Sequence, residues 1–214
     1  MATRAIVFSL LPVGISPKQF SELQQRTVGN RKAAVRNADA SRESPGQVHQ
    51  IILGVDPSLR GTGYGVIQLA RPFPKTLAQG TIKCPVTWEH SRCLVSIAST
   101  LREVIAKTAP TVCIVEGIFF AQNLKTAIVM GQARGAALVA AGEAGLTIYE
   151  IATRKVKQAI VGYGAAQKSA VARMVQRMLN LSKLPEPDAA DALALALTHA
   201  QGSNGVRVKP LKAI

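Results

Sequence analysis

From Ile51 onward the chain alternates short apolar runs with amphipathic segments, and this order constrains the fold more than any other feature. Three apolar runs come first, and segments with helical periodicity then alternate with two further runs before the series ends in helical segments. Three strands in succession predict an antiparallel meander, and strands separated by helices predict parallel pairing. The sequence therefore predicts an α/β fold with a mixed central sheet flanked by helices.

The expected elements are bounded by prolines, glycines and polar turns. The expected strands are 51–56, 64–70, 77–84, 111–118 and 146–151, and the expected helices are 90–110, 123–145, 153–163, 166–181 and 188–200. Residues 50–201 therefore form the expected folded domain. We expect residues 202–214 to be a basic C-terminal tail.

Residues 1–49 differ from the rest because most of them are polar, lack periodicity and lead into Ser-Pro-Gly. This composition predicts a disordered basic extension. An organelle transit peptide has a similar Arg-rich, acid-poor composition, so that alternative stays open. The apolar runs are far shorter than the roughly 18 residues of a membrane span. Three cysteines without metal-type or redox-type spacing favour a reducing compartment, so we expect a cytoplasmic protein.

The charge balance points to a polyanionic partner. Lys and Arg number 26 against 12 Asp and Glu, which gives a formal net charge of +14 and an isoelectric point near 10.3. Such a surplus is typical of proteins that bind nucleic acid or an anionic membrane. It favours nucleic acid, and it makes the few acidic residues conspicuous.

Four acids lie where the predicted fold could bring them together. Asp56 ends the first strand and Glu116 ends the fourth, while Asp188 and Asp191 share one face at the start of the last helix. If the first and fourth strands are neighbours and the helix crosses their ends, the four carboxylates converge. They would repel one another unless divalent cations bound them. Mg²⁺ prefers such oxygen ligands, and a pair of ions can hydrolyse a phosphodiester.

Each acid alone also has a structural interpretation. Asp188 could cap the last helix, Asp191 could interact with its dipole, and Asp56 could belong to a turn. Glu116 is harder to explain, because a carboxylate inside an apolar strand is costly unless it is paired or bound to metal. The Gly-rich segment after Asp56 is ambiguous too, since actin-like ATPases have a similar phosphate-binding loop.

Four segments together resemble a known family. They are IILGVDPSLRGTGYGVI, IVEGIFFAQNLKTAIVMGQARGAALVAA, TRKVKQAIVGYGAAQKSAV and PDAADALALALTHA, in this order over about residues 51–200. They resemble the bacterial RuvC Holliday junction resolvases. The resemblance implies an RNase H-like fold, a homodimer, and Mg²⁺-dependent nicking of two symmetric strands of a four-way DNA junction, with Mn²⁺ as a substitute. It also implies RuvA and RuvB as partners.

The resemblance assigns roles to individual residues. It places the catalytic, metal-binding acids at Asp56, Glu116, Asp188 and Asp191, and the functional lysines at Lys157 and Lys168. The aromatic residue that contacts the opened junction falls on Phe119, although its neighbour Phe120 could serve instead. The other expected DNA contacts are Asn123, Arg134, Arg154 and Lys155. Gly117 departs from the family pattern, in which a Gln commonly follows the Glu.

Three other functions share some of these features. An RNase H-like nuclease acting on RNA or on other branched DNA would share the acids. An actin-like ATP-binding enzyme would need a second phosphate loop and two domains, for which the chain is too short. An inactive DNA-binding protein would not need all four acids.

Small residues from Gly131 to Ala137 allow close helix contact, either at a dimer interface or against the sheet.

Overall fold

The computed structural model describes residues 49–117, 123–203 and 212–213, and these belong to one compact unit. A single sheet of six strands in the order β3-β2-β1-β4-β5-β6 forms its centre. The strands are β1 (Ile51–Asp56), β2 (Gly61–Gln68), β3 (Lys75–Lys83), β4 (Val112–Glu116), β5 (Thr147–Ile151) and β6 (Lys212–Ala213). The helices are α2 (His90–Thr108), α3 (Leu124–Glu143), α4 (Thr153–Val161), α5 (Lys168–Met178) and α6 (Pro187–Ser203).

The sheet has the predicted mixture of pairings. β1, β2 and β3 form an antiparallel meander, and β4 and β5 extend it in parallel from β1. The expected convergence of the four acids required the first and fourth strands to be neighbours. β1 and β4 are indeed neighbours. β6 pairs antiparallel with β5, which the sequence did not predict. The segment expected as a C-terminal tail thus contributes the end of α6 and an edge strand.

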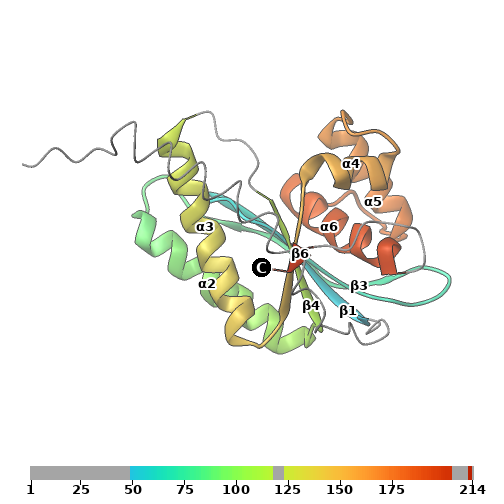
Figure 1. The fold of residues 1–214 in the computed structure, drawn as a ribbon, viewed down its shortest axis with the longest axis horizontal. Helices are drawn as coiled ribbons and strands as arrows, with labels where there is room; N and C mark the ends of the chain where they lie inside the picture. Colours follow the sequence, from blue (N-terminus) through green and yellow to red (C-terminus); the bar gives the residue numbers. More distant parts are fainter. Residues whose placement is uncertain (1–48, 118–122, 204–211, 214) are drawn as a thin grey trace, which may run out of the picture. The chain divides into compact units, whose positions relative to one another are not determined.

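Helices cover both faces of the sheet (Figure 1). α2 and α3 lie on one face, and α4, α5 and α6 lie on the other. Alternate residues of β1 serve the two sides: Leu53 and Val55 join the core beneath α2 and α3, whereas Ile52 joins the core beneath α6. None of the helices in the described part of the chain has the length and apolarity that a bilayer crossing requires.

α6 lies unusually close to β1 and β2 because glycines line the sheet beneath it. A Cβ atom added at Gly54 would lie 2.0 Å from the Ala192 carbonyl oxygen, and one at Gly65 would lie 2.6 Å from Leu193 Cδ2. β2 begins at Gly61, so the glycines expected in a turn are strand residues. The glycines of this segment therefore form a surface on which α6 packs.

Three aromatic rings meet where α6 approaches β5. His199 of α6 lies 5.5 Å from the stacked ring of Tyr149 and 5.3 Å from the ring of His49, between centroids. Burial, together with the charge of the neighbouring His49, lowers the pKa of His199 to about 4. Burial also lowers the pKa of His49, although a backbone hydrogen bond with Thr111 opposes this. Both imidazoles are therefore neutral at pH 7.

We expect this cluster to make the fold sensitive to acid. Between pH 6.5 and about 4 the unfolded chain binds a proton at His199 that the folded chain does not, so the free energy of unfolding falls as pH decreases. His199 should account for roughly 2–3 kcal/mol of this loss. Chemical denaturation of wild type and His199→Gln at pH 7 and 4.5 measures it. The variant should lose less stability, and His90→Gln, at an exposed position, should behave as wild type.

Candidate active site

The ends of two parallel strands and the start of α6 bring the four acids to one edge of the sheet. Asp56 and Glu116 are the last residues of β1 and β4, which pair in parallel up to Val55 and Val115. Asp188 stands in the first turn of α6 beside the start of β2, where a Cβ atom added at Gly61 would lie 2.9 Å from its Oδ2 atom. Asp56, Glu116 and Asp188 therefore stand at the same end of the sheet.

These carboxylates influence one another strongly. Burial, a hydrogen bond with Glu116, and charge repulsion from Glu116 and Asp191 together raise the pKa of Asp56 to about 8, against the opposing effect of Lys168. Burial raises the pKa of Asp191 as well, although Lys168 opposes the increase through an ion pair of 2.8 Å between Nζ and Oδ2. The same hydrogen bond with Asp191 raises the pKa of Lys168, and Asp56 and Asp188 contribute. The ammonium group of Lys168 thus interacts with three acids, Asp191, Asp56 and Asp188.

The donor set suits a hard divalent cation. Across the residues that the structure describes, no three His, Cys, Asp or Glu side chains are grouped as ligands of a single metal ion. Two of the carboxylates are bound within the protein instead, Glu116 by Thr153 and Asp191 by Lys168. However, charge repulsion from neighbouring carboxylates raises the pKa of Asp56 and of Asp191, and a bound Mg²⁺ would relieve that repulsion. The residues therefore fit this metal by their chemistry, and a bound cation would compete with Lys168 for Asp191.

Glu116 is held by contacts that the sequence did not predict. The Thr153 hydroxyl donates to Glu116 Oε1 at 2.5 Å, and the next residue, Gly117, donates its N–H to the Ile151 carbonyl at 2.9 Å. Arg134 donates to the Glu116 main-chain carbonyl and pairs with the Glu150 carboxylate. Thr153 lies 37 residues after Glu116, and no local pattern predicts such a contact.

The expected DNA contacts have different surroundings. The Arg134 side chain is only 12% exposed and is bound as described, whereas Arg154 and Lys155 are exposed in the first turn of α4. Asn123 caps α3, because its side chain accepts the Thr126 N–H at 2.9 Å. Lys157 is half-buried on α4. Phe119 and Phe120 lie outside the described residues.

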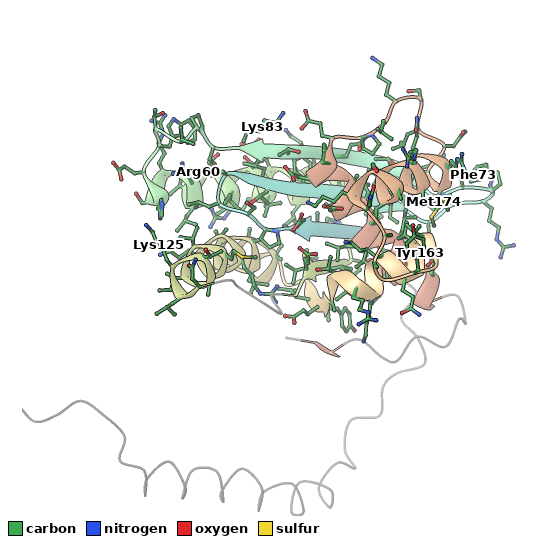
Figure 2. The ribbon with its side chains drawn as sticks, turned by 90° about the horizontal axis from the view of Figure 1, so that it is seen from above. Arg60, Phe73, Lys83, Lys125, Tyr163 and Met174 are labelled. Carbon is green, nitrogen blue, oxygen red and sulfur yellow. The ribbon has the colours of Figure 1, made fainter. Side chains whose placement is uncertain are left out.

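Further basic side chains stand at the same end of the sheet as the acids. Figure 2 shows Arg60, Lys83 and Lys125 there, and Phe73 at the opposite end. Lys83 ends β3 and pairs with Glu186 at 2.8 Å, and Lys125 is exposed in the first turn of α3. Basic side chains therefore stand at the end of the sheet that carries the acids, and Lys83 is already paired there.

Known proteins resemble this chain over most of its length. The family model "Crossover junction endodeoxyribonuclease RuvC" matches residues 52–199. The curated protein of that name from Akkermansia muciniphila is 44% identical over 162 residues, covering 76% of this chain and 94% of that protein. The corresponding protein of Pasteurella multocida is 47% identical over 150 residues, covering 70% of this chain and 78% of that protein.

A solved structure gives the same result. Thermus thermophilus RuvC in complex with a Holliday junction substrate superposes with a TM-score of 0.70 and 34% identity, covering 78% of this chain and all of that one. The predicted RNase H-like fold and the predicted family are both confirmed. By the extent of the family match and the identity to its members, this chain belongs to the RuvC family of crossover junction endodeoxyribonucleases.

Proposed function

We propose that this chain resolves four-way DNA junctions by nicking two symmetric strands. The observation that carries the proposal is the convergence of Asp56, Glu116, Asp188 and Asp191 at one edge of the sheet in a member of this nuclease family. We assign these four residues as the catalytic acids and as the ligands of Mg²⁺, with two ions per subunit. Mn²⁺ has similar ligand preferences and should substitute.

The protein's own groups bind and orient the DNA in this mechanism. Bound Mg²⁺ would supply an activated water and stabilise the leaving oxygen. Lys168 and Lys157 neutralise phosphate charge near the cut, in competition with the ion pair that Lys168 makes with Asp191. Arg154 and Lys155 contact the DNA backbone, and Asn123, at the start of α3, is a further DNA contact. We keep Phe119 as the aromatic residue that contacts the opened junction.

A junction-cleavage assay tests the function directly. The chain is incubated with a synthetic mobile four-way junction and with linear duplex, single-stranded and three-way DNA and an RNA–DNA hybrid, each with Mg²⁺ or EDTA. We expect paired, symmetric nicks in the four-way junction that require Mg²⁺. Equal cutting of the three-way DNA or of the hybrid would favour a less selective RNase H-like nuclease. No cutting of any substrate would contradict the proposal.

A second copy of the chain should cover the outer face of α3. Leu124, Ile128 and Val139 are 76%, 52% and 52% exposed there, and a Cβ atom added at Gly131 or Gly135 would meet nothing within 4 Å. Glycines that lie between apolar side chains suit a close helix contact. A two-fold dimer would also place one active site on each of two equivalent strands of the junction.

We expect Ile128→Lys to weaken this dimer. A buried ammonium at the centre of the interface should raise the dissociation constant at least about tenfold, the equivalent of about 1.4 kcal/mol. Sedimentation equilibrium measures the change, and the two nicks in one junction should become uncoupled. Val95→Lys introduces the same charge at an exposed position on α2 and serves as the control. Unchanged association of the Ile128→Lys chain would mean that the α3 face is not the interface.

The partners and the cellular location are parts of the same proposal. RuvA and RuvB are the partners that the family membership suggests, and co-purification with junction DNA present would test them. We propose a cytoplasmic location. The alternative, organelle targeting through residues 1–49, is tested by imaging the fluorescently tagged chain with and without those residues.

A further inference from the structure

Thr153 makes a direct contact with one of the proposed metal ligands. Its hydroxyl donates to Glu116 Oε1 at 2.5 Å from the first residue of α4. β5 ends at Ile151, which pairs with Glu116 in the parallel ladder, so the chain reaches α4 just beside this carboxylate. The contact thus joins the end of β4 to the start of α4.

The helix does not need this hydroxyl for its own stability. Ala152 is the N-cap residue of α4 and makes no side-chain cap, and Thr153 lies one position inside the helix. Thr and Ser near a helix start commonly bond to free backbone N–H groups. Here the Thr153 side chain binds Glu116 instead. In addition, the positive end of the α4 dipole favours a carboxylate at this place.

The rest of Glu116 is already fixed. Arg134 binds its main-chain carbonyl and is itself paired with Glu150, while the Gly117 N–H bonds to the Ile151 carbonyl. The side-chain torsions of Glu116 are the freedom that remains. Repulsion from the neighbouring acids would favour rotamers that turn its carboxylate away from them. A hydrogen bond to Oε1 opposes that rotation.

We propose that Thr153 is a positioning residue that holds the Glu116 carboxylate in its ligand orientation. The proposal rests on the proposed function, which makes Glu116 a metal ligand. Removing a hydrogen bond to a metal-binding carboxylate typically lowers metal affinity about 10–100-fold. We therefore expect Thr153 to act on metal affinity and, through it, on the nicking rate, with little effect on the stability of the metal-free protein, because its side chain is exposed.

Two substitutions separate the hydroxyl from the shape of the side chain. Thr153→Val keeps the volume and removes the donor, whereas Thr153→Ser keeps the donor. Thr111→Val is the matched control, because Thr111 is also exposed and donates one hydroxyl hydrogen bond, to the Ile51 carbonyl at 3.0 Å, at the opposite end of β4. The measurements are melting in EDTA, the increase of melting temperature during Mg²⁺ and Mn²⁺ titrations, and single-turnover nicking of a four-way junction against Mg²⁺ concentration.

The proposal predicts a specific pattern. Thr153→Val should melt as wild type in EDTA, need about 10–100-fold more metal for the same melting increase, and recover most of its nicking at high Mg²⁺. Thr153→Ser and Thr111→Val should titrate as wild type. A Val variant that titrates as wild type, while Glu116→Gln abolishes the melting increase, would overturn the role of Thr153 alone. If wild type and Glu116→Gln respond equally to metal, the assignment of Glu116 as a ligand fails, and the proposal fails with it.

Discussion

Asp56→Asn should reduce junction nicking by at least roughly a thousandfold, because losing a ligand of a metal that supplies several kcal/mol of transition-state stabilisation has an effect of this size. Junction binding should stay close to that of wild type, since it depends mainly on basic groups, for which we propose Arg154 and Lys155 as phosphate contacts. Gel-shift affinity at fixed salt and single-turnover nicking measure the two properties separately.

The same substitution should stabilise the metal-free protein. The pKa of Asp56 is about 8 in the folded chain and 3.8 in the absence of interactions, so the folded chain holds a proton that the unfolded chain releases. The free energy of unfolding therefore decreases as pH rises from 4 through 8. Asn cannot ionise and avoids this loss. In EDTA at pH 8 the variant should melt roughly 2–8 °C above wild type, the shift that about 1–2 kcal/mol gives in a domain of this size.

The other acids provide the comparison. Glu116→Gln, Asp188→Asn and Asp191→Asn should each lose nicking and keep junction binding. Asp191→Asn should not gain stability as Asp56→Asn does, because it also removes the partner of Lys168. Nicking close to the wild-type rate by any of the four variants would exclude that residue from the site. A lower melting temperature of Asp56→Asn in EDTA would show that repulsion at Asp56 is weaker than the structure indicates.

The sequence predicted those features that local patterns determine. Apolar runs and helical periodicity placed β1, β4 and α6, and the acids were found because each stands at the end of such a segment. β6 was missed because a pair of residues, Lys212 and Ala213, has no recognisable pattern and their pairing depends on the free edge of β5. Strand propensity is weak, and the tertiary context decides such cases.

Contacts between distant segments could not be predicted. Thr153 and Arg134 reach Glu116 across 37 and 18 residues, and only the assembled sheet brings them together. The family resemblance predicted Arg134 as a DNA contact. No periodic pattern in the sequence predicts its ion pair with Glu150. The glycines of β2 were ambiguous for the same reason, because the helix that covers them lies more than a hundred residues further along the chain.

Gly63→Ala should cause a large loss of stability. A Cβ atom at this position would lie 2.0 Å from the carbonyl oxygen and 2.4 Å from the carbonyl carbon of Asp188. Both atoms belong to the backbone of α6, so no side-chain rotation can relieve the clash, and the helix must move away from β2. We expect a decrease of about 3–5 kcal/mol in the free energy of unfolding, at the upper end of overpacking effects.

The same movement should damage the active site in the molecules that still fold. α6 carries both Asp188 and Asp191, so lifting its first turn from β2 displaces acids of the site from Asp56, which pairs with Gly63. Nicking per folded molecule, measured at a temperature where the variant is folded, should therefore fall together with the melting temperature. Gly142→Ala is the matched control: a Cβ atom there meets nothing within 4 Å, and in a helix this change should add about 0.5–1 kcal/mol. If Gly63→Ala melted and cut as wild type does, α6 could not lie this close to β2, and the position of Asp188 beside the strand ends would have to be revised.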